Sequence, residues 1–445
     1  MTALVCLGIT SWASAGEVTF RTVALSGDVA PGTAGLTYLV FSEPPSINSA
    51  GQTAFAAITT DGLASIWSEG SGALALVARV LDQAPGAPDG SLFILFFNST
   101  NAFSRPPLND SGHTTFNATL TGPAIGSRGI WSDESGTLAV VARGDDQAPG
   151  TGKGVKFLDS FFWSRSPRFN NAGQIAFTAT LTGPDVVFTN DAGVWAGSTG
   201  AVALVAREGD PAPGTAPGVV FGNGITTEPV LNGAGEVVFT TTLTGPGVDA
   251  SNNSGLWAGG AGSLGLVVRA GDVAPGAGAN FLGFQDPVLN DLGQTAFKGT
   301  LVDFTIGVCS EETGSLSLVA LQGDHAPGTP AGVTFNTFTP LVLNALGHTL
   351  IKALLTGSGV NSSNDIGYWS TASGTLALVA REGDPAPGTD AGVVFEVLNS
   401  SPTLNGAGHI AFHARVTGPG VATSNRDGIL GADTGRRGDP GRAHG

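Results

Sequence analysis

Apolar residues along this chain alternate with polar or small residues in short runs, and turn-forming residues separate each run from the next. The segment of residues 174–183, QIAFTATLTG, is representative, because Ile175, Phe177, Ala179 and Leu181 occupy every second position. A period of two is typical of a β-strand that buries one face, and no segment shows a credible helical period. The pattern therefore predicts an all-β protein.

One unit of about 60 residues recurs along the chain. It contains the pattern Asn-x-x-Gly, an alternating segment, a short strand of Gly-apolar-Trp type, the strand Leu-x-Leu-Val-Ala-Arg and a turn of Gly-Asp-x-Ala-Pro-Gly type. The Asn of the first pattern stands at Asn48, Asn109, Asn170, Asn232, Asn290, Asn344 and Asn405. The Trp position holds Trp67, Trp131, Trp195, Trp257, Cys309, Trp369 and Leu430.

Each unit contains four segments of period two. Asn can close a turn on its own backbone, and the Gly three residues later can adopt positive φ, so Asn-x-x-Gly predicts a tight hairpin. Four strands in each of seven units indicate a seven-bladed β-propeller with four antiparallel strands per blade. The predicted units are residues 26–80, 81–144, 145–208, 209–270, 271–322, 323–382 and 383–431.

The two ends of the chain predict how the ring closes. Residues 17–25, EVTFRTVAL, match the fourth strand of a unit, whereas the seventh unit ends after its third strand at Gly431. We expect the N-terminal strand to complete the last blade, because closing a ring removes unpaired strand edges. Blades that begin at the third strand of each unit, which holds the Trp position, would close the ring equally well. The small, polar residues 432–445 are expected to form a disordered tail.

The N-terminus resembles a secretory signal peptide. Residues 1–15 carry no charge and end in Ala13-Ser14-Ala15, a small-x-small cleavage pattern. The alternative is a buried first strand. Cleavage after Ala15 would remove Cys6 and leave Cys309 without a disulfide partner. From the signal-peptide pattern we predict an exported protein, and we expect it to be a monomer. No later segment approaches the roughly 18 apolar residues of a membrane helix, so we predict that the chain does not span a membrane.

Composition excludes some classes of partner. Hydrophobic residues make up 41% of the 445 residues, which is enough for a large core. Asp and Glu number 35 against 19 Lys and Arg, for a net charge of −16. So acidic a surface repels phosphate backbones, and we predict no nucleic-acid partner.

The repeat resembles that of a known bacterial family. Residues 48–55 read NSAGQTAF, and residues 170–177, 290–297 and 405–412 read NNAGQIAF, NDLGQTAF and NGAGHIAF. This is similar to the NxxGxxAF tandem-repeat, or choice-of-anchor, proteins, and the resemblance covers residues 17–431. It implies a secreted or cell-surface bacterial protein, usually held by a C-terminal anchor, and it implies no defined activity. The sequence shows no terminal hydrophobic helix or sorting motif that would match such an anchor.

Most residues that could carry chemistry recur in every unit, which favours a structural role. The Asp of each Gly-Asp-x-Ala-Pro-Gly turn could bind calcium, but it stands alone and is expected to bond its own turn. The Trp series could form a sugar platform, but one Trp per unit in the same strand predicts core packing between blades. We therefore predict no cofactor, with calcium as the alternative. His113, His348 and His409 each follow a turn Gly and are expected to be solvated.

The least repetitive segments offer a different candidate. They place Arg105, Trp163, Arg165 and Arg168 close to the first strand of the second and third units, and Glu228 and Asp286 in the corresponding strands of the next two. Such a cluster of arginines, an aromatic ring and carboxylates could hold an anionic or sugar ligand near the channel mouth. The alternative is apolar packing with incidental surface charges.

The sequence contains no nucleophile elbow, HExxH motif, P-loop or paired His ligands. We therefore predict an exported, non-catalytic binding or scaffold module for a protein or polysaccharide. One alternative is a glycosidase or lyase that uses Glu228 and Asp286 as a carboxylate pair. A second alternative is a structural surface-layer component.

Overall fold

The computed structural model describes residues 21–41, 44–97, 106–124, 128–159, 167–225, 228–398 and 401–433. These residues form strands, turns and one 3₁₀ helix, η1 (Gly122–Ala124), and they include no α-helix. The all-β prediction is confirmed for this part of the chain.

Seven antiparallel sheets follow one another along the described residues. The first sheet contains β1 (Tyr38–Phe41), β2 (Ser46–Ile47), β3 (Thr53–Thr59), β4 (Ala64–Ser68) and β5 (Ala75–Arg79). The second contains β6 (Leu92–Phe97), β7 (Thr115–Thr121), β8 (Arg128–Ser132) and β9 (Ala139–Arg143). The third contains β10 (Lys156–Phe157), β11 (Arg168–Phe169), β12 (Ile175–Thr182), β13 (Ala192–Gly197) and β14 (Ala203–Arg207).

The remaining four sheets repeat this order. The fourth contains β15 (Val220–Phe221), β16 (Val230–Leu231), β17 (Val237–Thr244), β18 (Ser254–Gly259) and β19 (Gly265–Arg269). The fifth contains β20 (Phe281–Leu289), β21 (Thr295–Leu301), β22 (Ile306–Ser310) and β23 (Ser317–Leu321). The sixth contains β24 (Val333–Leu343), β25 (Thr349–Gly357), β26 (Ile366–Ser370) and β27 (Ala377–Arg381). The seventh contains β28 (Val394–Val397), β29 (Thr403–Leu404), β30 (His409–Thr417) and β31 (Asp427–Asp433).

Strand order within a sheet follows the chain, as the repeat predicted. In the fifth sheet, for example, β20 pairs with β21, β21 with β22 and β22 with β23. In the five-stranded sheets and in the seventh sheet the first strand is divided, and both pieces pair with the same neighbour, so the seventh sheet has no fourth strand among the described residues. Even in the continuous β20, two register shifts interrupt the ladder, and such bulges re-aim side chains along a sheet edge.

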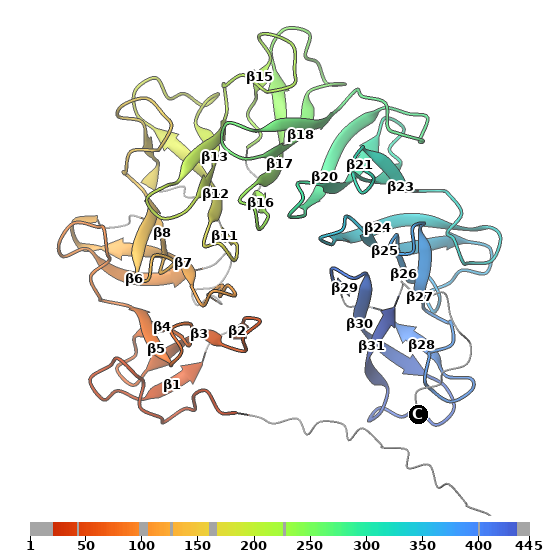
Figure 1. Cartoon of the computed structure of the whole chain (residues 1–445), viewed down its shortest axis with the longest axis horizontal. Helices are drawn as coiled ribbons and strands as arrows, with labels where there is room; N and C mark the ends of the chain where they lie inside the picture. The colour runs from red at the N-terminus through yellow and green to blue at the C-terminus, as the bar shows by residue number, and fades with distance from the viewer. Residues whose placement is uncertain are drawn as a thin grey trace, which may run out of the picture.

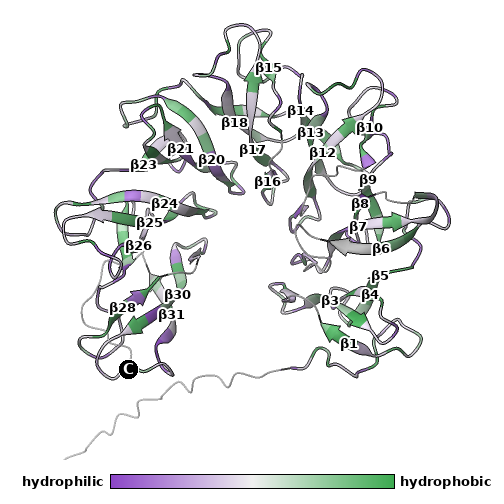
Figure 2. Cartoon of the chain, turned by 180° about the vertical axis from the view of Figure 1, so that it is seen from behind, coloured by the Kyte–Doolittle hydropathy of each residue, from purple (hydrophilic) through white to green (hydrophobic). Residues whose placement is uncertain are grey.

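Figure 1 shows the sheets following one another around a common centre, from the first sheet in red and orange to the seventh in blue. The short strands β2, β11, β16 and β29, which lead into Asn-x-x-Gly turns, lie on the inner side of this arc. The arc is open between β1 and β31. Figure 2 shows that apolar residues concentrate on the strands and hydrophilic residues on the connections.

The core lies between consecutive sheets. Six apolar clusters each combine buried residues from two neighbouring sheets. We call the interface between two consecutive sheets a seam. The five Trp of the repeat are fully buried, four of them in such clusters and Trp67 in a cluster of the first sheet with Val23 and Ala24. Each indole N–H donates to the Pro carbonyl of its Gly-Asp-x-Ala-Pro-Gly turn at 2.9–3.0 Å. Cys309 occupies the same slot and is equally buried, which raises the pKa of its thiol to about 12. The prediction that this series packs between sheets is confirmed for the second to the sixth units.

A ladder of side-chain bonds joins the inner turns. In each of six successive pairs of sheets, the Asn side chain donates from Nδ2 to the backbone carbonyl of the next sheet's Asn at 2.9–3.0 Å. The Oδ1 atom of the same Asn accepts backbone N–H groups of its own turn, as Asn170 does from Ala172 and Gln174. One residue type therefore closes the hairpin and also fixes its distance from the next sheet.

Ring closure is not seen among the described residues, and one prediction about the C-terminal end is wrong. Residues 21–25 form no strand, and residues 17–20 lie outside the described part, so the expected strand over 17–25 does not complete the last sheet here. No described strand other than β30 pairs with β31. In addition, β31 extends through Ala432 and Asp433, which were assigned to the tail. The signal peptide over 1–15 and residues 434–445 also lie outside the described residues.

Candidate functional site

Three of the six predicted ligand-binding residues, Arg105, Trp163 and Arg165, lie outside the described residues. Of the others, Arg168 at the start of β11 lies 3.6 Å from Glu228, with Arg168 about half exposed. This ion pair links the third and fourth sheets at their inner strands. At such exposure it contributes little stability, on the order of 0–1 kcal/mol.

Asp286 has a different partner. It lies in a bulge of β20 with φ at 49°, and its carboxylate is 2.6 Å from Nζ of Lys298. The same ammonium group donates to the carbonyl of Phe338 in the sixth sheet at 3.5 Å. The structure therefore brings Arg168 to Glu228 and Lys298 to Asp286, and it does not join the two carboxylates in one contact. A Glu228–Asp286 catalytic pair gains no support from these contacts.

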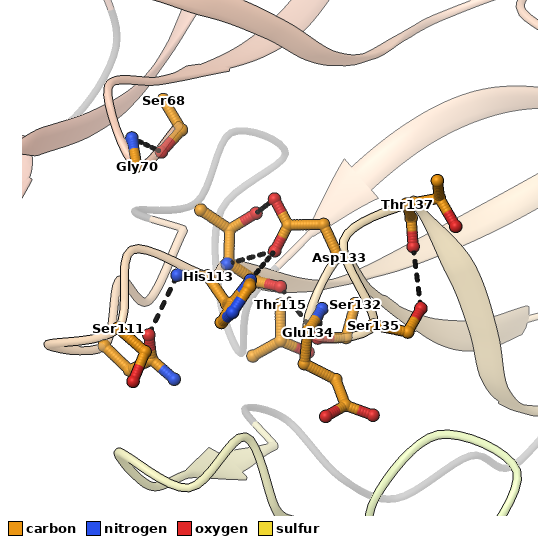
Figure 3. Close-up of polar contacts among 12 residues, drawn as sticks. Ser68, Gly70, Ser111, His113, Thr115, Ser132, Asp133, Glu134, Ser135 and Thr137 are labelled. Carbon is orange, nitrogen blue, oxygen red and sulfur yellow. Dashed lines mark hydrogen bonds and ion pairs between the residues drawn. The ribbon is translucent and has the colours of Figure 1, made fainter. Parts of the chain in front are cut away.

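A second polar group lies at the start of β7 and the end of β8 (Figure 3). His113 Nδ1 is 3.8 Å from an Asp133 carboxylate that also accepts from the backbone N–H and the hydroxyl of Thr114. Burial raises the pKa of Asp133. Glu311 accepts from Thr295 in the same manner in the fifth sheet, so the carboxylate is a recurrent structural acceptor.

The three His residues were expected to be solvated, and His409 is exposed. His113 and His348 are only partly exposed, and each faces a carboxylate, Asp133 at 3.8 Å and Glu312 at 3.9 Å.

The Asp residues of the Gly-Asp-x-Ala-Pro-Gly turns bond their own turns in two units. Asp28 accepts from the N–H of Leu25 and Asp272 from the N–H of Arg269, at 3.0 and 2.8 Å. These bonds support the turn role that was preferred to calcium binding. Within the described residues, no group of three or more His, Cys, Asp or Glu side chains could hold a metal ion.

A cavity of about 290 Å³ lies at the seam between the fourth and fifth sheets. We call it the hydroxyl pocket, because Thr240, Thr242, Ser254 and Thr300 line it together with Gln285 and Phe284. None of the described residues that line it is charged. Ser254 Oγ also donates to the Leu282 carbonyl at 3.5 Å and so connects the two sheets at the pocket.

The two walls of the hydroxyl pocket differ in chemistry. Val238, Thr240 and Thr242 occupy every second position of β17 and therefore lie on the same face of the strand. Val238 packs in the cluster shared with the fifth sheet. Ser254 pairs with Thr242 and joins this face. Across the seam, the Phe284 ring packs against the rings of Phe281 and Phe297, with centroids 5.4 and 5.6 Å apart. Hydroxyl groups thus face an aromatic wall.

Comparison of equivalent positions shows why the pocket occurs in this seam. The Thr242–Ser254 pair closes the ladder between the second and third strands of the fourth sheet. The corresponding pairs elsewhere are Ile58–Ala64, Thr119–Arg128, Thr180–Ala192, Thr300–Ile306, Leu354–Ile366 and Arg415–Asp427. Only the fourth-sheet pair carries two uncharged hydroxyl groups among the described sheets. This signal was present in the aligned repeats but was missed.

A second cavity of about 380 Å³ lies on the same seam. We call it the turn pocket, and its lining includes Asn252, Arg269, Ala270, Asp272 and Asn280. The Arg269 guanidinium already donates to the carbonyl and to the side-chain oxygen of Asn252, at 2.7 and 3.2 Å. Ala270 follows β19 where Glu208 follows β14 in the third sheet. The short Ala side chain leaves space that a longer one would fill.

Glu208 shows what fills the neighbouring seam. It is 3% exposed, and its carboxylate accepts the N–H groups of Gly224 and Ile225 at 2.9 and 3.2 Å. Burial raises the pKa of Glu208 to about 7, with a smaller contribution from nearby Asp191, although the backbone donors act in the opposite direction. The carboxylate holds a loop of the fourth sheet and is unavailable to a ligand.

Comparison with known proteins gives a family but no activity. A model described as a family of unknown function (DUF7453) matches residues 7–196, 154–309 and 303–437. A search of curated proteins gave no match. No helix among the described residues is long and apolar enough to span a membrane.

Solved structures with some likeness include three proteins. An oligogalacturonate lyase in complex with manganese is 12% identical, with a TM-score of 0.36 over 86% of this chain and 94% of that chain. The Hadza microbial sialidase Hz136 is 10% identical, with a TM-score of 0.27 over 69% and 65%. A mutant of Aleuria aurantia lectin, in complex with α-methyl-L-fucoside, is 12% identical, with a TM-score of 0.24 over 76% and 93%. These scores are too low to support an argument about fold family or function.

Proposed function

Since the chain belongs to the DUF7453 family of unknown function, we propose its role from the site: an exported, non-catalytic module that binds polysaccharide. The neutral hydroxyl pocket is the observation that carries this proposal. Threonine and serine hydroxyls, an amide and an aromatic ring provide hydrogen bonds and a flat apolar surface, which together suit a sugar ring. General acid–base cleavage of a glycosidic bond needs paired carboxyl groups, and the described lining of this pocket contains none.

We also propose that the seven units close as a β-propeller ring. Val23 and Ala24 pack against the buried cluster of the first sheet, which contains Tyr38 and Trp67. In the next cluster, Val77 and Ala78 of β5 pack in the same way against the second sheet. Residues 21–25 therefore occupy the place of a preceding fourth strand, and the seventh sheet lacks such a strand among its described residues. Pairing of these residues with β31 would complete the ring.

Export from a bacterial cell, as the signal-peptide pattern and the NxxGxxAF resemblance predict, fits such a role. A secreted ring with a neutral saccharide site needs no cofactor and no membrane span. The family match names no activity, so this placement rests on the sequence pattern of residues 1–15 and on the repeats.

The test separates binding from turnover. We expect polysaccharide fragments to raise the melting temperature of the full chain. At a ligand concentration of a hundred times Kd, binding adds about 2.7 kcal/mol to the free energy of unfolding. The same mixtures should release no new chain ends. Glu228→Ala and Asp286→Ala should leave the shift unchanged. Release of fragments by the wild type that collapses in these variants would instead establish the carbohydrate-active enzyme.

A further inference from the structure

We infer, resting on the proposed function, that the fourth–fifth seam binds an uncharged, linear saccharide of at least two units. One sugar ring occupies the hydroxyl pocket, between the Thr242 hydroxyl and the Phe284 ring, and the next occupies the turn pocket beside Ala270. Both pockets lie between the fourth and fifth sheets.

The lining selects against charged sugars. The hydroxyl pocket offers no cation among its described residues, and the Arg269 guanidinium in the turn pocket is already engaged by Asn252. Asp272, also in the turn pocket, would repel a carboxylate. The net charge of −16 further lowers the local concentration of acidic polysaccharide. Uncharged sugars meet none of these penalties.

The two pockets adjoin, because the turn pocket lies just beyond the ends of strands that line the hydroxyl pocket. Ser254, Gly283 and Thr300 line the hydroxyl pocket, and Asn252, Asn280 and Val302 line the turn pocket two or three residues away. At about 3.3 Å per residue, the two linings are separated by roughly 7–10 Å along the strands. This spacing suits neighbouring units of one chain better than two independent ligands.

Both pockets arise where the fourth unit departs from the repeat. Gly222 and Gly224 leave room beside the Thr242 hydroxyl, because a Cβ at either would lie 2.8 Å from Oγ1. Ala270 stands where the third, fifth and sixth units carry Glu208, Gln322 and Glu382, and where the first and second carry Val80 and Gly144. Substitutions that restore residues of the other units should therefore close the site and preserve the fold.

The experiment uses the full chain on an array of uncharged and uronate-containing oligosaccharides of one to six units, followed by calorimetric titration of the bound compounds. We expect the wild type to bind uncharged oligomers, with affinity that rises from one to two units. Thr242→Val should weaken binding about five- to tenfold through loss of one hydrogen bond. Thr180→Val, the same change at the same ladder position of the third sheet, should leave Kd unchanged.

A second variant tests the length of the site. Ala270→Gln fills the turn pocket with the residue that the fifth unit carries, so the gain in affinity from one to two units should disappear. Melting temperatures of all variants report whether they fold, and Ser254→Ala replaces Thr242→Val if the latter does not. Binding of uronates only, or equal affinity in Thr242→Val and Thr180→Val, would overturn this inference and leave a polysaccharide-binding module. No binding to any glycan would overturn the proposed function itself.

Discussion

The third–fourth and fourth–fifth seams share one hydrogen-bonded frame but differ in what fills it. In both, an Asn side chain donates to the next Asn carbonyl, from Asn170 to Asn232 and from Asn232 to Asn290. Glu208 fills the first seam and bonds the loop opposite, whereas Ala270 stands in the same place in the second and leaves a cavity. The comparison teaches that the repeated residues hold the sheets together, while single departures from the repeat leave open space between them.

The variant with the largest expected effect disrupts the third–fourth seam, which Glu208 fills. Trp257 is fully buried in the cluster between the third and fourth sheets, and its indole donates to the Pro213 carbonyl at 3.0 Å. Trp257→Ala should lower the free energy of unfolding by about 3–5 kcal/mol through the cavity it leaves. Chemical denaturation measures the loss, with Trp257→Phe as the milder control. A loss below about 1 kcal/mol would show that this seam does not carry the stability assigned to it.

The next effect is specific to the filled seam and depends on pH. Glu208 has a pKa of about 7 in the folded protein, above the 4.5 of an ordinary Glu. Between these values the unfolded chain has released the proton that the folded chain keeps, so the free energy of unfolding falls as pH rises from about 4.5 to 7. The shift corresponds to roughly 3 kcal/mol across that window.

Glu208→Gln should remove this pH dependence, because the amide oxygen still accepts the N–H groups of Gly224 and Ile225 but does not titrate. Gln322 stands at this position in the fifth unit and accepts the Ile306 N–H at 3.0 Å. Melting curves between pH 4 and 8 provide the measurement. Glu382, whose pKa burial also raises, keeps its own contribution in the variant. An unchanged slope would show that Glu208 is ionised in the folded state at acidic pH.

The repeat made the fold predictable because the same physical constraints recur in each unit. Alternation set the strands, and Asn with Gly set the turns, so strand content and order could be derived from the sequence. Burial of the Trp series followed from its fixed strand position, and Cys309 confirms that this slot is apolar. The place of residues 21–25 was harder to derive, because pairing with β31 depends on contacts between the two distant ends of the chain.

The candidate site was less predictable because side-chain partners depend on local backbone irregularities. Asp286 turns toward Lys298 in a bulge with positive φ, and no sequence pattern distinguishes this from an orientation toward Glu228. The pocket residues Thr242 and Ser254 are ordinary for strands. They stand out only when the equivalent pairs of the seven units are compared, whereas the predicted ligand-binding residues came from the irregular segments.

The smallest effect tests whether the frame of the two seams continues around a closed ring. Asn232→Ala removes the donor to Asn290 and the turn bond from Glu236, and should cost about 2 kcal/mol. Asn405 makes the same turn bonds with Ala407 and His409. If the ring closes, its Nδ2 reaches the carbonyl of Asn48, and Asn405→Ala should cost as much as Asn232→Ala. Denaturation of both variants decides this: a loss at Asn405 smaller by about 1 kcal/mol or more would mean that the ladder ends there and the arc stays open, since the bond across the seam is worth about that much.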